Sequence, residues 1–431
     1  MKRRMKMVSL LIIFAFVTAM AFAGGKSEGA STAAPEKKVI RIQGAFVEPE
    51  ASRFEECLKA FEAETGIDVV YEGSKEFETQ ILVQAEAGTP PDVAALPQPG
   101  LMRNFAKRGF LTPLTPEVVS KIDANYSKSW KDLGSYEGKV YGVFHRVNAK
   151  SFVWYPKKAF KAKGYTIPKT WDELKALSDK IVADGGIPWS IGIESGSATG
   201  WAATDWMEDI MLRTAGPDVY DKWVNHEIPF NDPAVQNAAK IMLDIWMNPK
   251  YVLGGSTNIL TTNFGDAVKP LFTNPPKAWL HRQGNFITGF MPEDVQANLD
   301  EEVGVFALPS INPEWGTPVL GGGDQFVAFN DRPEVMQLMA YLTTWESAAP
   351  WAKAGGALFP YKDTNFNDYS SAIDRALAKI LVNAEVFRFD GSDNMPAEVG
   401  AGTFWTGMAD LVGGVPVNKV LDQIEESWPK K

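Results

Sequence analysis

The sequence predicts an α/β protein with two domains. Short apolar stretches of strand character alternate with longer stretches in which apolar residues recur at helical spacing. This alternation is typical of βαβ units around a mostly parallel sheet. The chain has 431 residues, which is more than one hydrophobic core usually covers, so two domains are expected.

Five segments near the start of the chain set this pattern. Residues 39–46 (VIRIQGAF) and 67–73 (IDVVYEG) have strand character, residues 51–66 and 77–89 have helical spacing, and a further strand is predicted at 91–96 (PDVAAL). We therefore expect strands and helices to alternate here, with the strands lying parallel in one sheet.

The same alternation returns later in the chain. A helix is predicted at 169–186, and strands are predicted at 189–194 (WSIGIE), 301–309 and 324–330. From about Arg332 onward the pattern is mainly helical, over 332–354 and 370–386.

The first 23 residues have the pattern of a secretory signal peptide. Four cationic side chains precede an apolar run from Val8 to Phe22, and Ala21-Phe22-Ala23 is a small-x-small cleavage site. A membrane-spanning helix needs about 20 apolar residues, and here a flexible Gly/Ser/Ala-rich tether, residues 24–38, follows directly. We expect export and cleavage after Ala23. A lipoprotein would need a cysteine at the cleavage point, where Gly24 stands, so the mature chain is expected to carry no lipid.

Charge and cysteine content exclude several classes of function. The net charge is −10, and removal of residues 1–23 makes it about −14, which argues against nucleic-acid binding because phosphate recognition needs a basic patch. Cys57 is the only cysteine, so the chain can form no internal disulfide. It lies on an apolar helical stripe and is predicted to pack in the core.

No metal or cofactor motif is apparent. His145, His226 and His281 are far apart in the sequence, and residues 363–368 (DTNFND) only imitate the start of a calcium loop. The run GGGD at 321–324 lacks the spacing of a dinucleotide fingerprint and the lysine of a phosphate loop, and there is no Gly-x-Ser-x-Gly elbow. We therefore expect no metal, no cofactor and no catalytic residue.

Tryptophans in polar, glycine-rich settings point to carbohydrate. The chain has 14 tryptophans; Trp201 lies near Asp205, Trp279 near Gln283, and Trp405 near Arg388, Asp390 and Asp393. A sugar presents apolar C–H faces and a rim of hydroxyls, so its pocket combines flat aromatic rings with carboxylates, amides and arginine. Two other interpretations stay open: buried tryptophans are often plain core, and carboxylates with aromatics also describe a glycosidase.

Several segments together resemble the extracellular solute-binding proteins of carbohydrate ABC importers, and within them the α-glucoside-type branch. The resemblance covers nearly all of the mature chain and is carried by the exported N-terminus, VIRIQGAF, EAGTPPDVAAL, RVNAKSFVWYPKKAF, KTWDELKALSDKI, LGGGDQFVAF and FDGSDNMPAEVGAGTFWTGM. It implies a periplasmic binding protein-like fold, with two α/β lobes of discontinuous chain that are joined by a hinge and close over the ligand.

The resemblance also implies where the chain crosses between the lobes. Crossings are expected at 141–157, at 303–311 and at 330–334. The following ranges result: residues 39–146 and 305–332 for lobe one, and residues 147–304 and 333–431 for lobe two.

By the same resemblance the sugar lies between the lobes, at loops that follow strands. The candidate ligand contacts are Phe46, Glu48, Gln98, Arg146, Gly323 and Asp324 from lobe one, and Glu194, Trp201, Asp205, His281, Gln283, Arg388, Asp390 and Trp405 from lobe two. Trp405 is predicted to be a stacking platform for the sugar and Phe404 a core residue. Arg388 and Asp390 could instead pair with each other and hold their loop.

The function expected from the resemblance is that of a binding protein without catalytic activity. It would capture a sugar, an α-glucoside or an oligosaccharide, outside the cytoplasm or in the periplasm and deliver it, as a monomer, to a membrane permease. A secreted glycoside hydrolase is the first alternative and would need two carboxylates about 5–9.5 Å apart around one bond. A polyamine or peptide binder is the second, and it would need a strongly acidic cleft without Arg388 and Arg146.

Overall fold

The computed structural model describes residues 38–384 and 386–430. The predicted signal peptide and all of the predicted tether except Lys38 lie outside the described residues. Within them, no helix has the length and apolar character needed to cross a membrane.

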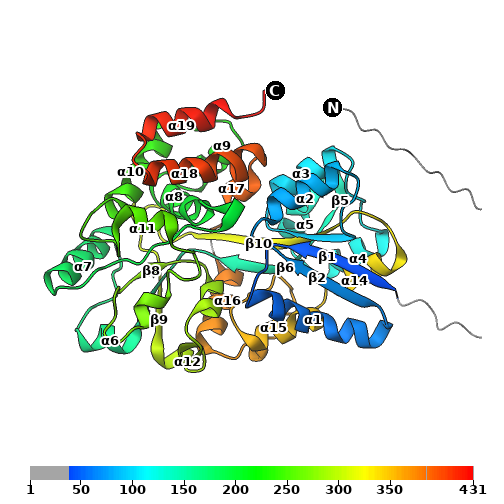
Figure 1. Cartoon of the computed structure of the whole chain (residues 1–431), viewed down its shortest axis with the longest axis horizontal. Helices are drawn as coiled ribbons and strands as arrows, with labels where there is room; N and C mark the ends of the chain where they lie inside the picture. The colour runs from blue at the N-terminus through cyan, green and yellow to red at the C-terminus, as the bar shows by residue number, and fades with distance from the viewer. Residues whose placement is uncertain (1–37, 385, 431) are drawn as a thin grey trace, which may run out of the picture. The chain divides into compact units, whose positions relative to one another are not determined.

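The N-terminal part forms the parallel half of a mixed six-stranded sheet (Figure 1). The strand β1 (Val39–Gly44) pairs in parallel with both β2 (Asp68–Gly73) and β3 (Val93–Leu96). The helices α1 (Glu50–Thr65) and α2 (Phe77–Glu86) connect these strands. The strand–helix alternation predicted for this region is therefore confirmed.

One long strand ties this half of the sheet to the rest of the chain. All ten residues of β10 (Val319–Ala328) are buried. Along one edge β10 pairs first with β11 (Phe387–Phe389), in parallel, and then with β3, antiparallel; along its other edge it pairs with β6 (Gly142–Ala149). Figure 1 shows β10 and β6 running side by side through the middle of the molecule. The sequence predicted only the second half of β10, because glycines weaken strand propensity.

A smaller sheet holds the strand that was predicted as the second crossing. The central strand β7 (Phe152–Pro156) pairs with β8 (His281–Arg282) and with β9 (Val303–Ala307). Residues 303–307 thus pair with β7, and the segment that reaches both β11 and β3 is β10. The strand predicted at 189–194 is absent, and its residues make only isolated bridges.

The chain also stays with the N-terminal elements beyond the third predicted crossing at 330–334. The helix α14 (Pro333–Tyr341) packs beside β10 and α4 (Pro116–Asn125), and α15 (Trp345–Ala354) packs on α1. In this region the packing therefore differs from the predicted lobe boundaries.

A buried helix organises the other half of the molecule. Residues 202–213 of α8 (Trp201–Thr214) are all buried, because α10 (Pro233–Trp246) and α18 (Trp405–Val412) pack against it. The remaining elements are α3 (Pro99–Lys107), α5 (Lys128–Leu133), β4 (Ser135–Tyr136), β5 (Lys139–Val140), α6 (Lys157–Ala162), α7 (Trp171–Ala183), η1 (Gly196–Ala198), α9 (Pro217–Val224), α11 (Gly255–Thr261), η2 (Lys269–Phe272), η3 (Asn285–Phe290), α12 (Glu293–Gln296), α13 (Leu299–Glu302), η4 (Phe366–Asp368), α16 (Ala372–Asn383), α17 (Gly391–Asn394), η5 (Glu398–Phe404) and α19 (Val417–Glu426).

Candidate functional site

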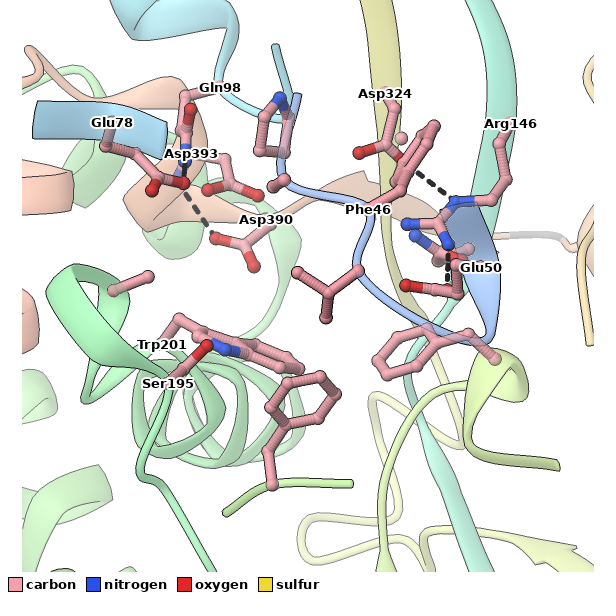
Figure 2. Close-up of a pocket in the computed structure, with 18 of the residues that line it drawn as sticks. Phe46, Glu50, Glu78, Gln98, Arg146, Ser195, Trp201, Asp324, Asp390 and Asp393 are labelled. Atoms are coloured by element: carbon pink, nitrogen blue, oxygen red, sulfur yellow. Dashed lines mark hydrogen bonds and ion pairs between the residues drawn. The ribbon is translucent and has the colours of Figure 1, made fainter. Parts of the chain in front are cut away.

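A cavity lies where the loops after β1 and β3 face the start of α8 and the loop after β11 (Figure 2). It contains about 890 Å³ of empty space, part of it continuous with solvent. Eight of the predicted site residues lie in its wall: Phe46, Gln98, Arg146, Trp201, Gly323, Asp324, Asp390 and Trp405. Residues far apart in the sequence thus meet at one site.

Three predicted site residues lie outside the cavity wall and form hydrogen bonds within their own loops. Glu48 accepts a hydrogen bond from the Ser52 hydroxyl at 2.8 Å, in the first turn of α1. Glu194 accepts the amide N–H of Gly196 at 2.9 Å and so closes the loop before η1. The side-chain oxygen of Gln283 accepts the amide N–H of Gly284 at 2.9 Å.

The remaining three predicted site residues lie behind the cavity wall or away from it. His281 is buried and its Nδ1 contacts the carbonyl oxygen of Ser190 at 2.8 Å. Arg388 donates from Nε to the carboxylate of Asp221 at 2.7 Å, so the pairing suggested for it with Asp390 is wrong. Asp205 lies in the layer directly behind the wall, where it accepts a hydrogen bond from Lys150.

An aromatic group forms one side of the cavity. The half-buried ring of Trp201 meets Phe264 edge-on at 5.1 Å between ring centroids, and Phe286 lies 5.9 Å from it. Trp201 begins α8 directly after Gly200, which has φ 114°, and a Cβ on this glycine would lie 2.1 Å from the carbonyl oxygen of Trp405. Only glycine permits this approach, so Gly200 positions both tryptophans at the cavity.

A buried lysine lies next to this aromatic side. Lys150 Nζ is 5.3 Å from the ring centroid of Trp201, and it donates to Asp390 at 2.5 Å and to Asp205 at 2.9 Å, with Asp393 at 4.0 Å. Burial lowers the pKa of Lys150, but the neighbouring carboxylates reverse this effect and hold its pKa well above the usual value. Lys150 is therefore a permanent cation at neutral pH.

The two carboxylates of α17 and its N-cap respond to this cation differently. Burial raises the pKa of Asp390, yet the charge of Lys150 and the hydrogen bonds to this carboxylate together outweigh burial and hold that pKa below its usual value. Asp393 is farther from the lysine, and burial together with the charge of Asp390 raises its pKa well above normal. Asp390 is therefore an ion, and Asp393 retains its proton to a higher pH.

A second polar layer supports this group from behind. Asp209 of α8 accepts hydrogen bonds from Arg282 at 2.9 Å and from Ser151 at 2.8 Å, and it also pairs with Arg213. Glu208, one residue earlier, accepts the amide N–H groups of Gly391 at 2.7 Å and Ser392 at 2.9 Å. Glu208 thus holds the loop that carries Asp390, and Asp209 holds the segments around Ser151 and Arg282.

The opposite side of the cavity is built around Arg146. Its guanidinium donates to Asp324 at 2.7 Å, pairs with Glu50, and lies 4.5 Å above the ring centroid of Phe46 (Figure 2). The Gln98 amide nitrogen, which lies beside Asp393 in Figure 2, donates to Glu78 at 3.2 Å. Burial raises the pKa of Glu78.

Two cavity-lining amides have side-chain oxygens without a partner. Gln98 Oε1 and Asn148 Oδ1 are buried and accept no hydrogen bond from the described residues. A buried polar atom without a partner costs about 1–3 kcal/mol. A ligand that brings hydroxyl donors to both oxygens would remove this cost.

Hydrogen bonds join the two sides at the rim. The Ser197 hydroxyl of η1 donates to the carbonyl oxygen of Lys75 at 3.1 Å. At another point Arg103 of α3 donates to the Asn394 side chain of α17 at 2.7 Å. Parts of the molecule on either side of the cavity are therefore in direct contact.

Several residues of the cavity wall were not identified from the sequence. Lys150 is the clearest case, although a cation within the apolar stretch FHRVNAKSFVWY was a usable signal. Phe264 and Phe286 come from segments without periodicity, so nothing in the sequence distinguished them from core residues. Glu50, Glu78 and Asn148 were also not among the candidates, and Asp393 was noted only as a neighbour of Trp405.

The structure assigns other roles to the possible metal ligands. Among residues 38–384 and 386–430, no three His, Cys, Asp or Glu side chains are grouped as metal ligands would be. Asp368, from the sequence that imitates a calcium loop, accepts the indole N–H of Trp345 at 2.8 Å. Cys57 is buried, and burial raises the pKa of its thiol to about 12.

The different states of Asp390 and Asp393 lead to a paired prediction. Asp390→Asn should lower the free energy of unfolding at pH 7 by about 1–3 kcal/mol, because it removes a charged hydrogen bond to Lys150. Asp393→Asn should lower it by less than about 1 kcal/mol, because the amide replaces a carboxyl group that already favours its neutral form. Urea denaturation of both variants checks this.

The stabilities of the Asp390→Asn and Asp393→Asn variants should also depend on pH in different ways. The stabilisation from Asp390, whose folded-state pKa is depressed, is present above its unfolded pKa and is lost as the pH falls. The contribution of Asp393, whose pKa is raised, is present at low pH and is lost as the pH rises, so Asp393→Asn should gain on the wild type as the pH increases. Equal losses in the two variants at all pH values would contradict the assignment.

Comparison with known proteins places this geometry in context. The model of the family described as bacterial extracellular solute-binding protein matches residues 47–349. The osmoprotective compounds-binding protein GgtB of Synechocystis is 47% identical over 399 residues, covering 92% of this chain and 93% of the relative. The alpha-glucosides-binding periplasmic protein AglE of Rhizobium meliloti is 41% identical over 400 residues, covering 91% of this chain and 87% of the relative.

Solved structures agree on the fold. The bacterial solute receptor AcbH has a TM-score of 0.79 at 20% identity, covering 91% of this chain and 97% of the receptor. A chitin oligosaccharide binding protein has a TM-score of 0.77 at 19% identity, covering 90% of this chain and 98% of that protein. The predicted fold class, two α/β lobes of discontinuous chain joined by a hinge, is confirmed by this likeness.

Proposed function

This chain belongs to the bacterial extracellular solute-binding proteins, and we propose that it captures a sugar between its two lobes and delivers it to the permease of an ABC importer. One observation carries the proposal. A single cavity sets the ring of Trp201 across from Gln98 (Figure 2), and two buried acceptors in its wall, Gln98 Oε1 and Asn148 Oδ1, lack partners among the described residues. A sugar offers an apolar face to the ring and hydroxyl donors to the acceptors.

The proposed ligand is a small neutral glycoside, of the α-glucoside type. The name of AglE refers to alpha-glucosides and that of GgtB to osmoprotective compounds. A neutral polyol suits the cavity because the two buried cations in its wall already have partners: Arg146 binds Asp324, and Lys150 binds Asp390. A neutral ligand leaves these ion pairs intact.

The lobes proposed for this function follow the packing of the chain. Lobe one would hold the sheet of β1, β2 and β3 with α14 and α15, and lobe two would hold α8, α10, α18 and the sheet around β7. The strands β6 and β10 would form the hinge. A sugar would favour closure because only the closed form contacts it from both sides.

The two alternatives are less well supported. A glycoside hydrolase needs one carboxyl group free to act as an acid and a second free to act as a nucleophile or base. Glu78 and Asp393, whose pKa values are raised, could supply only the acid, because Asp324, Glu50 and Asp390 are each held by a cation. A polyamine binder would need a cleft without cationic groups, and Lys150 and Arg146 both lie in the wall.

Calorimetric titration with glucose, trehalose, sucrose, maltose and maltotriose tests the proposal. We expect saturable binding of at least one of the α-linked disaccharides, with a smaller radius of gyration in small-angle scattering when the ligand is present. Release of free monosaccharide during the titration would favour the hydrolase. Binding of spermidine but of no sugar would favour the polyamine binder.

We also propose that the chain is exported and cleaved after Ala23, which agrees with the family's extracellular location. Intact mass spectrometry of the exported protein should give the mass of a chain that begins at Gly24, without an added lipid. A mass that includes residues 1–23, or a lipid adduct, would contradict this prediction.

A further inference from the structure

A second cavity lies among elements that the proposed function does not use. It contains about 780 Å³ of empty space, part of it continuous with solvent. Parts of α1, η3, α12, α13 and the start of α16 line it, together with the two glycines that follow α15. The charged side chains in its wall are Arg53, Asp300, Glu301 and Asp374.

Asp374 is the unusual member of this wall. Its side chain is buried, with only 1% of the residue exposed, and neither carboxylate oxygen accepts a hydrogen bond of normal geometry from the described residues. Burial raises its pKa to about 6, although the Ser371 hydroxyl and the Gly356 amide lie close enough to lower it in part. At pH 7 and above, the cavity therefore holds a largely ionised carboxylate whose nearest donors, the Ser371 hydroxyl and the Gly356 amide, do not reach normal hydrogen-bond geometry.

The charge of Arg53 lowers the pKa of Asp374, but no neighbouring charged group donates a hydrogen bond to its carboxylate. Arg53 donates to the carbonyl oxygen of Gly355 at 3.2 Å and to Gln296 at 3.0 Å. The oxygens of Asp300 accept the amide N–H groups of Ala372 at 2.9 Å and of residue 373 at 3.1 Å. Arg53 and Asp300 thus already have hydrogen-bond partners, and Glu301 is exposed to solvent.

The two glycines keep the space beside Asp374 open. Gly355 and Gly356 have φ values of 85° and 82°, which favour glycine. A Cβ on Gly355 would lie 3.2 Å from Asp374 Oδ2, and one on Gly356 would lie 3.0 Å from Arg53 Nη1. Side chains at these positions would crowd the carboxylate and the guanidinium, so the backbone here preserves room for another group.

We propose that this second cavity binds a small primary ammonium compound, whose N–H donors satisfy the carboxylate of Asp374. An ammonium group supplies charge and up to three donors to one carboxylate. A metal ion is less suitable, because the described residues offer no group of three side-chain ligands here. The hydroxyls of Thr288 and Ser371 can hold the polar remainder of the ligand.

Saturation-transfer NMR with the mature protein tests the proposal through four probes. Ethanolamine and L-serine both carry a primary ammonium, choline keeps the positive charge without N–H donors, and L-lactate carries a carboxylate and a hydroxyl but no ammonium. We expect signals from ethanolamine or L-serine and none from choline or L-lactate. A stronger signal from L-serine would identify an amino acid as the ligand type, and an equal signal would identify a simple amine. Signals from choline equal to those from ethanolamine, or none from either ammonium probe, would overturn the proposal.

Variants locate the binding. Asp374→Asn should abolish the signal of the ammonium probes, whereas Asp331→Asn, a change at an exposed acidic residue outside this cavity, should preserve it. The signal should also fall as the pH drops from 7.5 to 5, because Asp374 then takes up a proton. Titration of each variant with the best disaccharide shows whether it is folded, and it keeps a failure of this proposal separate from a failure of the sugar site. Persistence of the signal in Asp374→Asn would place the ligand elsewhere and reject the site.

Discussion

Lys150→Met should lower the free energy of unfolding by about 3–5 kcal/mol, because it leaves buried carboxylates without their counter-charge. Lys150 is in contact with both Asp390 and Asp205, and all three side chains are buried. Methionine fills a similar volume, so the loss would reflect charge and hydrogen bonding more than packing. Urea denaturation at pH 7 measures the effect.

A surface lysine provides the matched control. Lys128 pairs with Asp132 at 2.5 Å, but its side chain is 85% exposed. Lys128→Met should change the free energy of unfolding by less than about 0.5 kcal/mol, as is usual for an exposed ion pair. The effect of Lys150→Met should shrink in acid, because in the variant the buried Asp390 has lost its counter-charge and takes up a proton as the pH falls. A loss that is the same at pH 4 and pH 7 would argue against an ionic origin.

Trp201→Ala should weaken sugar binding about 30-fold to 1000-fold, which corresponds to roughly 2–4 kcal/mol. The ring is half-buried and faces the cavity with Phe264 and Phe286 packed behind it, so its removal takes away the surface on which a sugar would stack. Calorimetric titration with the best disaccharide measures the loss, and a thermal melt without ligand measures stability.

Trp345→Ala is the control for this substitution. Trp345 is also half-buried, but it lies outside the cavity and donates its indole N–H to Asp368 at 2.8 Å. Its loss should lower the melting temperature. Sugar affinity should stay within a factor of about three, because Trp345 does not line the cavity; a tenfold change would need about 1.4 kcal/mol of binding energy. Near-normal affinity in Trp201→Ala would show that the aromatic side of the cavity does not contact the sugar.

The sequence predicted the elements with strong periodicity and missed those formed through tertiary contacts. The strands β1, β2 and β3 and the helices between them follow the expected order because each carries its own apolar pattern. The first half of β10 carries no such pattern. Its glycines are buried because the ring of Phe387 and the backbone of β6 lie directly against Gly321.

The candidate site shows the same division. Phe404 is fully buried among Trp223 and Phe230, and Trp405 reaches the cavity, as predicted for these neighbouring rings. Trp405 is only 3% exposed, however, whereas Trp201 presents more of its ring. Whether either ring stacks on a sugar is still a prediction. Lys150 could not be assigned a role from the sequence, because its partners lie 55 and 240 positions away.

The burial of Cys57 makes the protein suitable as an optical sensor. Its thiol is almost never ionised at neutral pH and is shielded from solvent, so alkylating reagents should not reach it. A cysteine introduced in place of Ser197, at the rim of the cavity, would therefore be the only site that a thiol-reactive fluorophore labels. Because Ser197 contacts Lys75 across the rim, the emission of that dye would report opening and closure of the lobes in real time.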